Sequence, residues 1–236
     1  MEAVYKRVLI KISGEALAGE KGTGFDFDFV SRVCEAVKSC TQMGVQIGIV
    51  IGAGNFWRGV KDGAGKVERV SADRMGMLGT AMNCLAVADV FRTHGVDAKI
   101  QSAMDIQGVG ERFDAKKSIE YLEQGSVVLF AGGTGCPFFS TDTAAVLRAA
   151  EIHADAILLA KNIDGVYSDD PRKNPEAVRF DSISYGEVLA RKLAVMDITA
   201  TSLAMDNNIP VAVFALKEPE NIQKVLRGEK IGTIVR

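Results

Sequence analysis

Short apolar runs alternate with stretches of helical periodicity along the whole chain. The runs are rich in Val, Ile, Leu and Ala and stop at glycine or at charged residues, which is typical of buried strands. We predict strands over Arg7–Ile12, Val45–Ile51, Ala98–Gln101, Val127–Phe130, Ala156–Ala160, Val211–Ala215 and Ile231–Val235.

Between these runs, apolar residues recur at intervals of three and four, as on the buried face of a helix. A capping box of Ser184 and Glu187 marks the start of one helix, and a polar excursion with several glycines is expected over Val60–Val70. The other predicted helices are Asp28–Met43, a long one from Ser71 or Ala72 to His94, Ala115–Gln124, one from Thr141 or Asp142 to Ile152, Asp197–Asn207 and Pro219–Leu226.

This alternation of strand and helix predicts the α/β class. Crossover helices cover both faces of a parallel sheet, so the expected architecture is a three-layer α/β/α sandwich with a mainly parallel central sheet. No linker rich in Pro, Gly, Ser or like charge divides the chain. We therefore expect a single domain over residues 1–236.

Four of the predicted strands run directly into loops that carry glycine or charge. These loops are Lys11–Gly14, Gly52–Gly59, Gly132–Thr141 and Lys161–Pro171. A glycine turn after one strand is an ordinary connection. The carboxyl ends of parallel strands, however, lie at one edge of the sheet, so the four loops are expected to converge there. Backbone N–H groups and helix N-termini at such an edge can hold an anion.

The central segment from Val127 to Ala145 has the richest chemistry of these junctions. A strand leads into Gly132, Gly133 and Gly135, and hydroxyl side chains follow in the loop and at the start of the next helix. The loop also contains Phe138 and Phe139, which offer flat apolar surface suited to a ring. We therefore predict that this loop binds a phosphorylated ring compound, although the phenylalanines could instead fill the core.

Composition narrows the classes of function. With 47% hydrophobic and 25% charged residues the chain is an ordinary globular protein, and 28 Lys and Arg against 30 Asp and Glu give a net charge of -2. Neither nucleic acid nor a membrane is therefore expected as a partner. The N-terminus has no signal-peptide pattern, and no apolar run approaches the length of a membrane span, so we expect a cytoplasmic protein.

The four cysteines do not indicate a metal site or a disulfide framework, because no two of them form a CxxC pair. We expect Cys34, Cys40 and Cys84 to pack in the core, whereas Cys136 falls in the central loop.

The loops fit none of the common phosphate-binding motifs. The chain has neither the GxxxxGK[ST] pattern nor the GxGxxG pattern, and it has only two histidines. Acyl transfer and proton abstraction usually need a positioned base. Phosphoryl transfer to an acceptor that is already an anion needs mainly positioning and positive charge. Lys11 and Arg58 would supply that charge, while Asp142 would either orient Lys11 by ion pairing or cap its own helix.

Five segments carry a family resemblance. They are KISGEAL (Lys11–Leu17), IGAGNFWRG (Ile51–Gly59), ADRMGMLGT (Ala72–Thr80), TGCPFFSTD (Thr134–Asp142) and DGVYSDDP (Asp164–Pro171). In this order they resemble the bacterial uridylate kinases of the amino acid kinase superfamily, and the resemblance runs from Tyr5 to the C-terminus. It implies an amino acid kinase-like fold, distinct from that of P-loop nucleoside monophosphate kinases.

The resemblance implies transfer of the ATP γ-phosphoryl group to UMP, giving UDP and ADP, with Mg as the partner of ATP. This step belongs to de novo pyrimidine nucleotide (CTP) biosynthesis. Family members are allosteric homohexamers, activated by GTP and inhibited by UTP. The segment linked to GTP activation corresponds to Gly19, Glu20, Lys21, Gly22, Thr23 and Gly24.

The resemblance also assigns residues to ligands. The expected catalytic residues are Lys11, Arg58 and Asp142. The residues expected to bind ATP are Lys11, Ile12, Ser13, Gly14, Gly54, Arg58, Asn162, Tyr167 and Asp170. The residues expected to bind UMP are Ala53, Asp73, Thr134, Gly135, Cys136, Pro137, Phe138, Phe139, Ser140 and Thr141, with Asp73 accepting from the ribose hydroxyls. No direct protein ligand for Mg is expected.

Three departures from the family pattern are local. Ala53 replaces a common glycine, and Cys136 stands where many relatives have Asn. The family varies at Lys161 and Asn162, so either one could make the nucleotide contact.

Two other kinds of protein belong to the same superfamily: kinases of carboxylates or carbamate, and an oxoanion storage protein. The central loop and Asp73 argue against the former, and the presence of both Lys11 and Arg58 argues against the latter.

Overall fold

A single sheet runs through the centre of the structure. The computed structural model describes residues 3–58 and 65–236, and within these ranges nine strands form one sheet in the order β4-β3-β5-β2-β1-β6-β8-β9-β7. The described pairs are parallel except that of β8 with β9. The strands are β1 (Arg7–Ile12), β2 (Gln46–Ile51), β3 (Ala98–Ser102), β4 (Glu111–Arg112), β5 (Val127–Ala131), β6 (Ala156–Lys161), β7 (Ser182–Ile183), β8 (Val211–Ala215) and β9 (Thr233–Val235).

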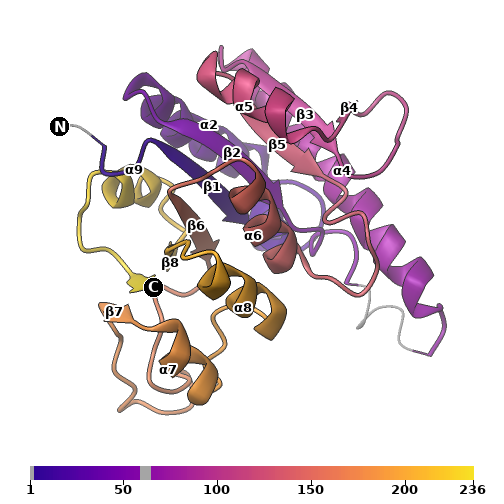
Figure 1. The fold of residues 1–236 in the computed structure, drawn as a ribbon. Helices are drawn as coiled ribbons and strands as arrows, with labels where there is room; N and C mark the ends of the chain where they lie inside the picture. The colour runs from indigo at the N-terminus through magenta and orange to yellow at the C-terminus, as the bar shows by residue number, and fades with distance from the viewer. Residues whose placement is uncertain (1–2, 59–64) are drawn as a thin grey trace.

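Helices cover the sheet on both sides, which confirms the predicted three layers (Figure 1). One face packs on α2 (Phe27–Gln42), α4 (Arg69–Thr93) and α9 (Asn221–Leu226). The other face packs on α5 (Ala115–Glu123), α6 (Thr141–Glu151), α7 (Tyr185–Ala190) and α8 (Ile198–Asp206). Two short elements, α1 (Gly14–Ala18) and the 3-10 helix η1 (Gly19–Lys21), follow β1. Within residues 3–58 and 65–236, every helix is too short or too polar to cross a lipid bilayer.

Alternation along β1 sends its side chains to both layers. Leu9 packs in the cluster beside α6, whereas Ile10 and Ile12 pack in the cluster beside α2. The neighbouring strand β2 needs a glycine at Gly48, because a Cβ there would lie 2.9 Å from the ring of Phe130. The central strands are therefore buried on both faces, as their continuous apolar runs predict.

The predicted start of one helix is wrong, whereas the start predicted at Thr141 or Asp142 is confirmed at Thr141. The long helix begins at Arg69 rather than at Ser71 or Ala72, since the N–H of Ala72 already donates to the carbonyl of Glu68 at 2.9 Å. An ion pair between Arg69 and Asp73, one turn apart, supports this earlier start. Asp142 does not cap its helix, because Ser140 occupies the N-cap position.

Other differences are smaller. The short elements β4, β7, α1 and η1 were not predicted, and the last strand begins at Thr233 rather than Ile231. The helix predicted from Pro219 begins at Asn221. Residues 59–64, which include the first part of the predicted excursion over Val60–Val70, lie outside the described residues.

The long loop after β6 is fastened to the sheet by one buried hydroxyl. The Oγ1 atom of Thr233 accepts from the N–H of Val166 at 2.8 Å and donates to the carbonyl of Phe180 at 2.5 Å. Thr233 itself is fully buried in β9. Both ends of the 166–180 loop therefore depend on this side chain.

We predict that Thr233→Val lowers the free energy of unfolding by about 1–3 kcal/mol, because two backbone groups lose their partner with little change in shape. Urea denaturation followed by circular dichroism measures this change. The control is Thr233→Ser, which keeps the hydroxyl and should lose less. A larger loss in the serine variant would show that the methyl group, and not the hydroxyl, carries the stability.

Candidate active site

The carboxyl ends of β1, β2, β5 and β6 meet at one edge of the sheet, as the sequence predicts. Register pairs Lys11 with Val50 of β2 and with Leu159 of β6, so the loops that follow these strands start at the same level. Two adjoining cavities of about 690 and 300 Å³ open at this edge, and both are lined by Lys11, Ser13 and Glu15. The strand ends therefore bring one lysine to the boundary between two binding spaces.

An ion pair holds that lysine in place. The Nζ atom of Lys11 lies 2.6 Å from Oδ1 of Asp142, and both side chains are largely shielded from solvent. The angles fall outside those of a regular hydrogen bond, so the attraction is mainly electrostatic. Ser140 Oγ accepts from the N–H groups of Asp142 and Thr143 at 3.0 and 3.2 Å. Because Ser140 caps the helix, the carboxylate of Asp142 can face the sheet. Of the two roles predicted for Asp142, ion pairing is the one observed.

The glycine loop after β2 packs against the start of α1. A Cβ on Gly14 would lie 2.5 Å from both the carbonyl oxygen of Gly52 and Oδ1 of Asn55. The side chains of Asn55 and Asn83 exchange two hydrogen bonds of 2.8 Å, and Asn83 also donates to the Gly52 carbonyl at 2.7 Å. Both asparagines are buried. This amide pair fixes the backbone that lines the smaller cavity.

The segment Gly19–Gly24 contacts the same loop through Asn55. Asn55 Nδ2 donates to the carbonyl of Gly24 at 2.9 Å, and the hydroxyl of Thr23 donates to the Asn55 carbonyl at 2.9 Å. The segment expected to respond to GTP is therefore bonded to the residue that follows Gly54.

Arg58 extends over the smaller cavity. Its guanidinium lies 2.7 Å from Oε1 of Glu15 in the first turn of α1, and both side chains are partly exposed. Glu15 was not singled out in the sequence, because nothing local separates it from other first-turn acidic residues.

Asp73 fastens the central loop to α4. Its Oδ2 accepts from the N–H of Phe138 at 2.7 Å, and Arg69 Nε lies 2.9 and 2.8 Å from its two oxygens. Phe138 adopts a φ of 72° and is exposed, with the Arg69 guanidinium 5.2 Å from its ring centre. A carboxylate has about four acceptor positions, so Asp73 keeps capacity for a further donor.

Most residues assigned from the sequence line the two cavities, but not all of them do. Ile12 points into the core, and Phe138 lines a third cavity of about 980 Å³. The assigned residues Gly135, Cys136, Pro137 and Asp142 are not among those that line either cavity. The larger cavity is lined by Lys11, Ser13, Asn162, Tyr167 and Asp170 of the assigned set. The smaller cavity is lined by Lys11, Ser13, Gly14, Ala53, Gly54, Arg58, Asp73, Thr134, Phe139, Ser140 and Thr141.

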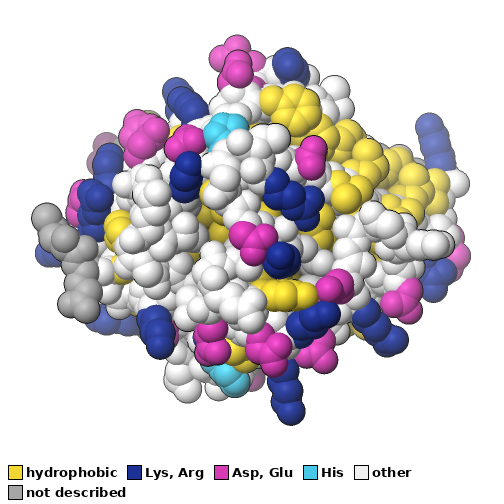
Figure 2. Space-filling model, turned by 90° about the horizontal axis from the view of Figure 1, so that it is seen from above, with side chains coloured by type: hydrophobic (Ala, Val, Ile, Leu, Met, Phe, Trp, Pro, Cys, Tyr) yellow, Lys and Arg dark blue, Asp and Glu magenta, His cyan; other side chains and the backbone are white. Residues whose placement is uncertain are grey.

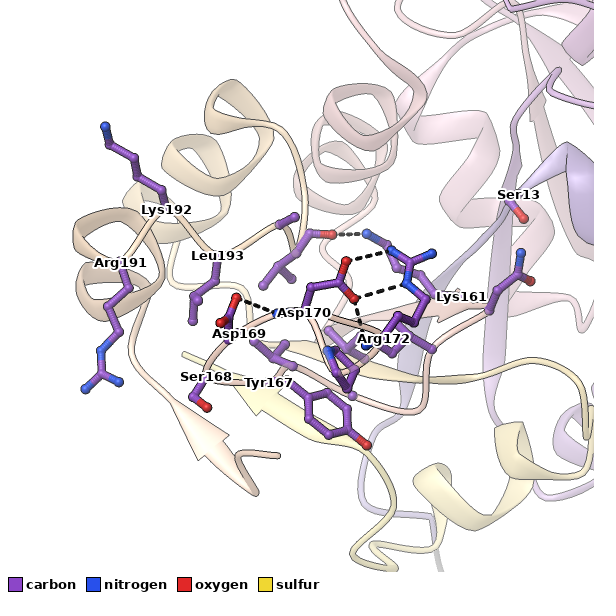
Figure 3. Close-up of a pocket in the computed structure, with 18 of the residues that line it drawn as sticks. Ser13, Lys161, Tyr167, Ser168, Asp169, Asp170, Arg172, Arg191, Lys192 and Leu193 are labelled. Carbon is purple, nitrogen blue, oxygen red and sulfur yellow. Dashed lines mark hydrogen bonds and ion pairs between the residues drawn. The ribbon is translucent and has the colours of Figure 1, made fainter. Parts of the chain in front are cut away.

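The loop after β6 forms the outer wall of the larger cavity (Figure 3). The hydroxyl of Tyr167 donates to Asp164 at 2.9 Å, and Arg172 donates to Asp170 at 3.0 Å. The Arg172 guanidinium holds the pKa of the Asp170 carboxyl below its usual value. Lys161 and Asn162 both line this cavity, with Lys161 as the last residue of β6 rather than the first of the loop.

Asp197 is a site residue that sequence reasoning placed only at a helix start. Its carboxylate caps α8 through the N–H of Ala200 at 2.9 Å and also accepts from the hydroxyls of Ser140 and Thr143. The first turns of α6 and α8 are thereby tied together. The partners lie 57 and 54 residues away, so no local signal could have revealed the link.

The comparisons with known proteins agree with this geometry. The family model described as the amino acid kinase family matches residues 6–215. A uridylate kinase from Streptococcus thermophilus (strain ATCC BAA-491 / LMD-9) is 52% identical over 235 residues, which cover 99% of this chain and 96% of the relative.

Two solved structures are similar over nearly the whole chain. The UMP kinase from Bacillus anthracis has a TM-score of 0.94 at 36% identity, covering 98% of this chain and 96% of that one. The UMP kinase from Ureaplasma parvum has a TM-score of 0.92 at 35% identity, covering 98% of both chains.

Proposed function

Because the chain belongs to the amino acid kinase family and its full-length relatives are uridylate kinases, we propose that it transfers the γ-phosphoryl group of ATP to UMP. The products are ADP and UDP. The observation that carries this proposal is the position of Lys11, which is paired with Asp142 and lies at the boundary between the two cavities.

The larger cavity is the proposed site of ATP and the smaller one that of UMP. Glycine-bearing backbone from the loops after β1 and β2 lies between them. Lys11 and Arg58 bring positive charge to this boundary, which is where negative charge accumulates during phosphoryl transfer. The UMP phosphate is already an anion, so its oxygen attacks without loss of a proton. This explains how the site can work without a histidine among its lining residues.

Magnesium is the proposed partner of ATP. Among residues 3–58 and 65–236, no three carboxylate, histidine or cysteine side chains form a cluster that could hold a metal ion. We propose that phosphate oxygens and water hold most of the ion. Bound in this way, Mg would neutralise part of the charge on the β- and γ-phosphates.

We further propose that the protein acts in de novo pyrimidine nucleotide biosynthesis in the cytoplasm, with GTP as activator and UTP as inhibitor. These points rest on the family resemblance. The bonds from Asn55 to Thr23 and Gly24 support the regulatory part, because they join the segment assigned to GTP with the glycine loop of the site.

The proposed assembly is a homohexamer. Helix α4 exposes Met75, Leu78, Met82 and Leu85 at intervals of three and four residues, the spacing of the apolar seam between paired helices. In Figure 2 hydrophobic side chains gather on the right of the face shown, the side on which α4 lies in Figure 1. We propose that this seam packs against α4 of a second copy.

Light scattering is expected to give the mass of six chains. Substituting Met82→Glu places a charge in the seam and should reduce that mass. A monomeric mass for the unmodified protein would contradict the assembly.

The proposed reaction is tested by transfer of labelled γ-phosphate from Mg-ATP to a panel of acceptors, with and without GTP. The panel contains UMP, CMP, dTMP, aspartate, glutamate and acetylglutamate. We expect rapid transfer to UMP. Transfer to a carboxylate instead would keep the ATP site but overturn the acceptor, and binding of ATP without transfer to any acceptor would favour a binding protein.

Asp73 tests the acceptor side of the site. We predict that Asp73→Asn raises KM for UMP about tenfold while changing KM for ATP by less than about twofold, because a charged acceptor of hydrogen bonds is lost. Steady-state kinetics with each substrate varied in turn measures both values. The control is Asp89→Asn, an exposed position further along the same helix. Equal effects on both substrates would remove Asp73 from the UMP site.

A further inference from the structure

Lys161 and Lys11 lie on the same face of the sheet. Side chains two residues apart on a strand point to the same face of the sheet. Lys11 therefore lies on the same face as Leu9 of β1, and Lys161 on the same face as Leu159 of β6, which is the face covered by α6. Register pairs Lys11 with Leu159, so Lys161 lies on the adjacent strand, two positions nearer the carboxyl end. Both lysines line the larger cavity.

One carboxylate interacts electrostatically with both lysines. Asp142 forms the ion pair with Lys11 at 2.6 Å, and it also attracts the ammonium of Lys161, whereas Lys11 repels that ammonium. Two cations on the cavity wall thus interact with one anion, Asp142, which is not itself among the residues that line the cavity. An additional anion at this position would balance the charge.

The bond that Lys161 makes in this structure leaves it able to bind such an anion. Its Nζ atom donates to the backbone carbonyl of Val195, which also lines the larger cavity (Figure 3). An ammonium has three donors, so a phosphate oxygen can be bound while this bond is kept. The carbonyl fixes the direction in which the remaining donors point.

We propose that Lys161 is a second catalytic lysine, whose ammonium donates to the γ-phosphoryl group of ATP beside Lys11. This inference rests on the proposed function. In the transfer step, the P–O bond to the ADP oxygen breaks and its electron pair stays on ADP, while a UMP phosphate oxygen forms the new bond to phosphorus. No proton is transferred, and Lys161 remains an ammonium throughout.

The electrostatics of the cavity wall support this role. Burial lowers the pKa of Lys161, Asp142 raises it and Lys11 lowers it further. A lysine in this position gains more from an incoming phosphate than an exposed lysine does, because water stabilises its charge less well. The other charged groups on the cavity wall are Glu15 of α1, Asp169, Asp170 and Arg172 of the loop after β6, and Arg191 and Lys192 after α7.

The first test compares Lys161→Met with Lys161→Arg. The methionine variant keeps the apolar stem and should lower kcat about 10²-fold or more, the loss expected when one donor to a reacting group is removed. The arginine variant should restore part of this loss, while KM for UMP stays near the parent value in both. The control is Lys217→Ala, an exposed lysine after the neighbouring strand β8. A methionine variant with kcat within about threefold of the parent would overturn the proposal.

The pH profile separates this role from a structural one. Because the protonated amine is the donor, kcat/KM for ATP in the parent should fall as pH rises through the lowered pKa of Lys161. In Lys161→Arg the fall should move to higher pH, since arginine stays charged. An unchanged alkaline limb would contradict the proposal.

A measurement on the unaltered protein covers the case in which the variants do not fold. Reductive methylation followed by mass spectrometry reports how reactive Lys161 and Lys217 are. A non-hydrolysable ATP analogue should protect Lys161, whereas AMP, which lacks the β- and γ-phosphates, should not. Equal protection by AMP would overturn the phosphate contact. If the parent transfers nothing to UMP but the analogue still protects Lys161, the acceptor is wrong and the lysine contact stands.

Discussion

The carboxylate of Asp142 is the interaction on which the site depends. Removing a lysine from water costs several kcal/mol unless its charge is balanced, and Lys11 is almost fully shielded at the end of a central strand. Asp142 supplies the balance from the first turn of α6. It can do so because Ser140 takes over the capping of that helix, and Ser140 is in turn held by Asp197. The charge at the centre of the site is thus fixed by contacts from three separate segments.

Much of the fold could be predicted because the strong signals are local. The predicted runs Arg7–Ile12 and Val211–Ala215 have the observed bounds of β1 and β8. Lys6 and Ser13 flank the first run, and Pro210 marks the start of the second. The parallel direction of the strands was also predictable, because a helix lies between most successive strands in the sequence. The short strands β4 and β7 have only two residues each, and two residues show no periodicity. The start of α4 was wrong because Glu68 makes no side-chain cap that a sequence could reveal.

The sequence predicted which strand ends form the candidate site, but not the contacts between its residues. Glycine, lysine and aspartate at those positions indicated anion binding, and parallel topology required them to converge. The contacts that give the site its geometry join residues far apart in sequence. Asn55 with Asn83 and Lys161 with Val195 are such pairs, and nothing within either segment indicates which partner its residue will meet. Their pairing follows from how the helices and loops return over the sheet, which a single sequence does not encode as a local pattern.

The lysines of the site lie on strands, whereas the residues proposed to bind the acceptor lie on a loop. This difference bears on selectivity among acceptors. Lys11 and Lys161 stand on adjacent, hydrogen-bonded central strands. The proposed acceptor side is a loop held to its surroundings by the contacts of Asp73 with Phe138 and of Ser140 with Asp197. Charge stabilisation at the strand ends serves any anionic acceptor equally well. If the proposed function holds, discrimination among acceptors falls to this loop, because a substrate-binding loop can differ while the lysines and the sheet beneath them stay the same.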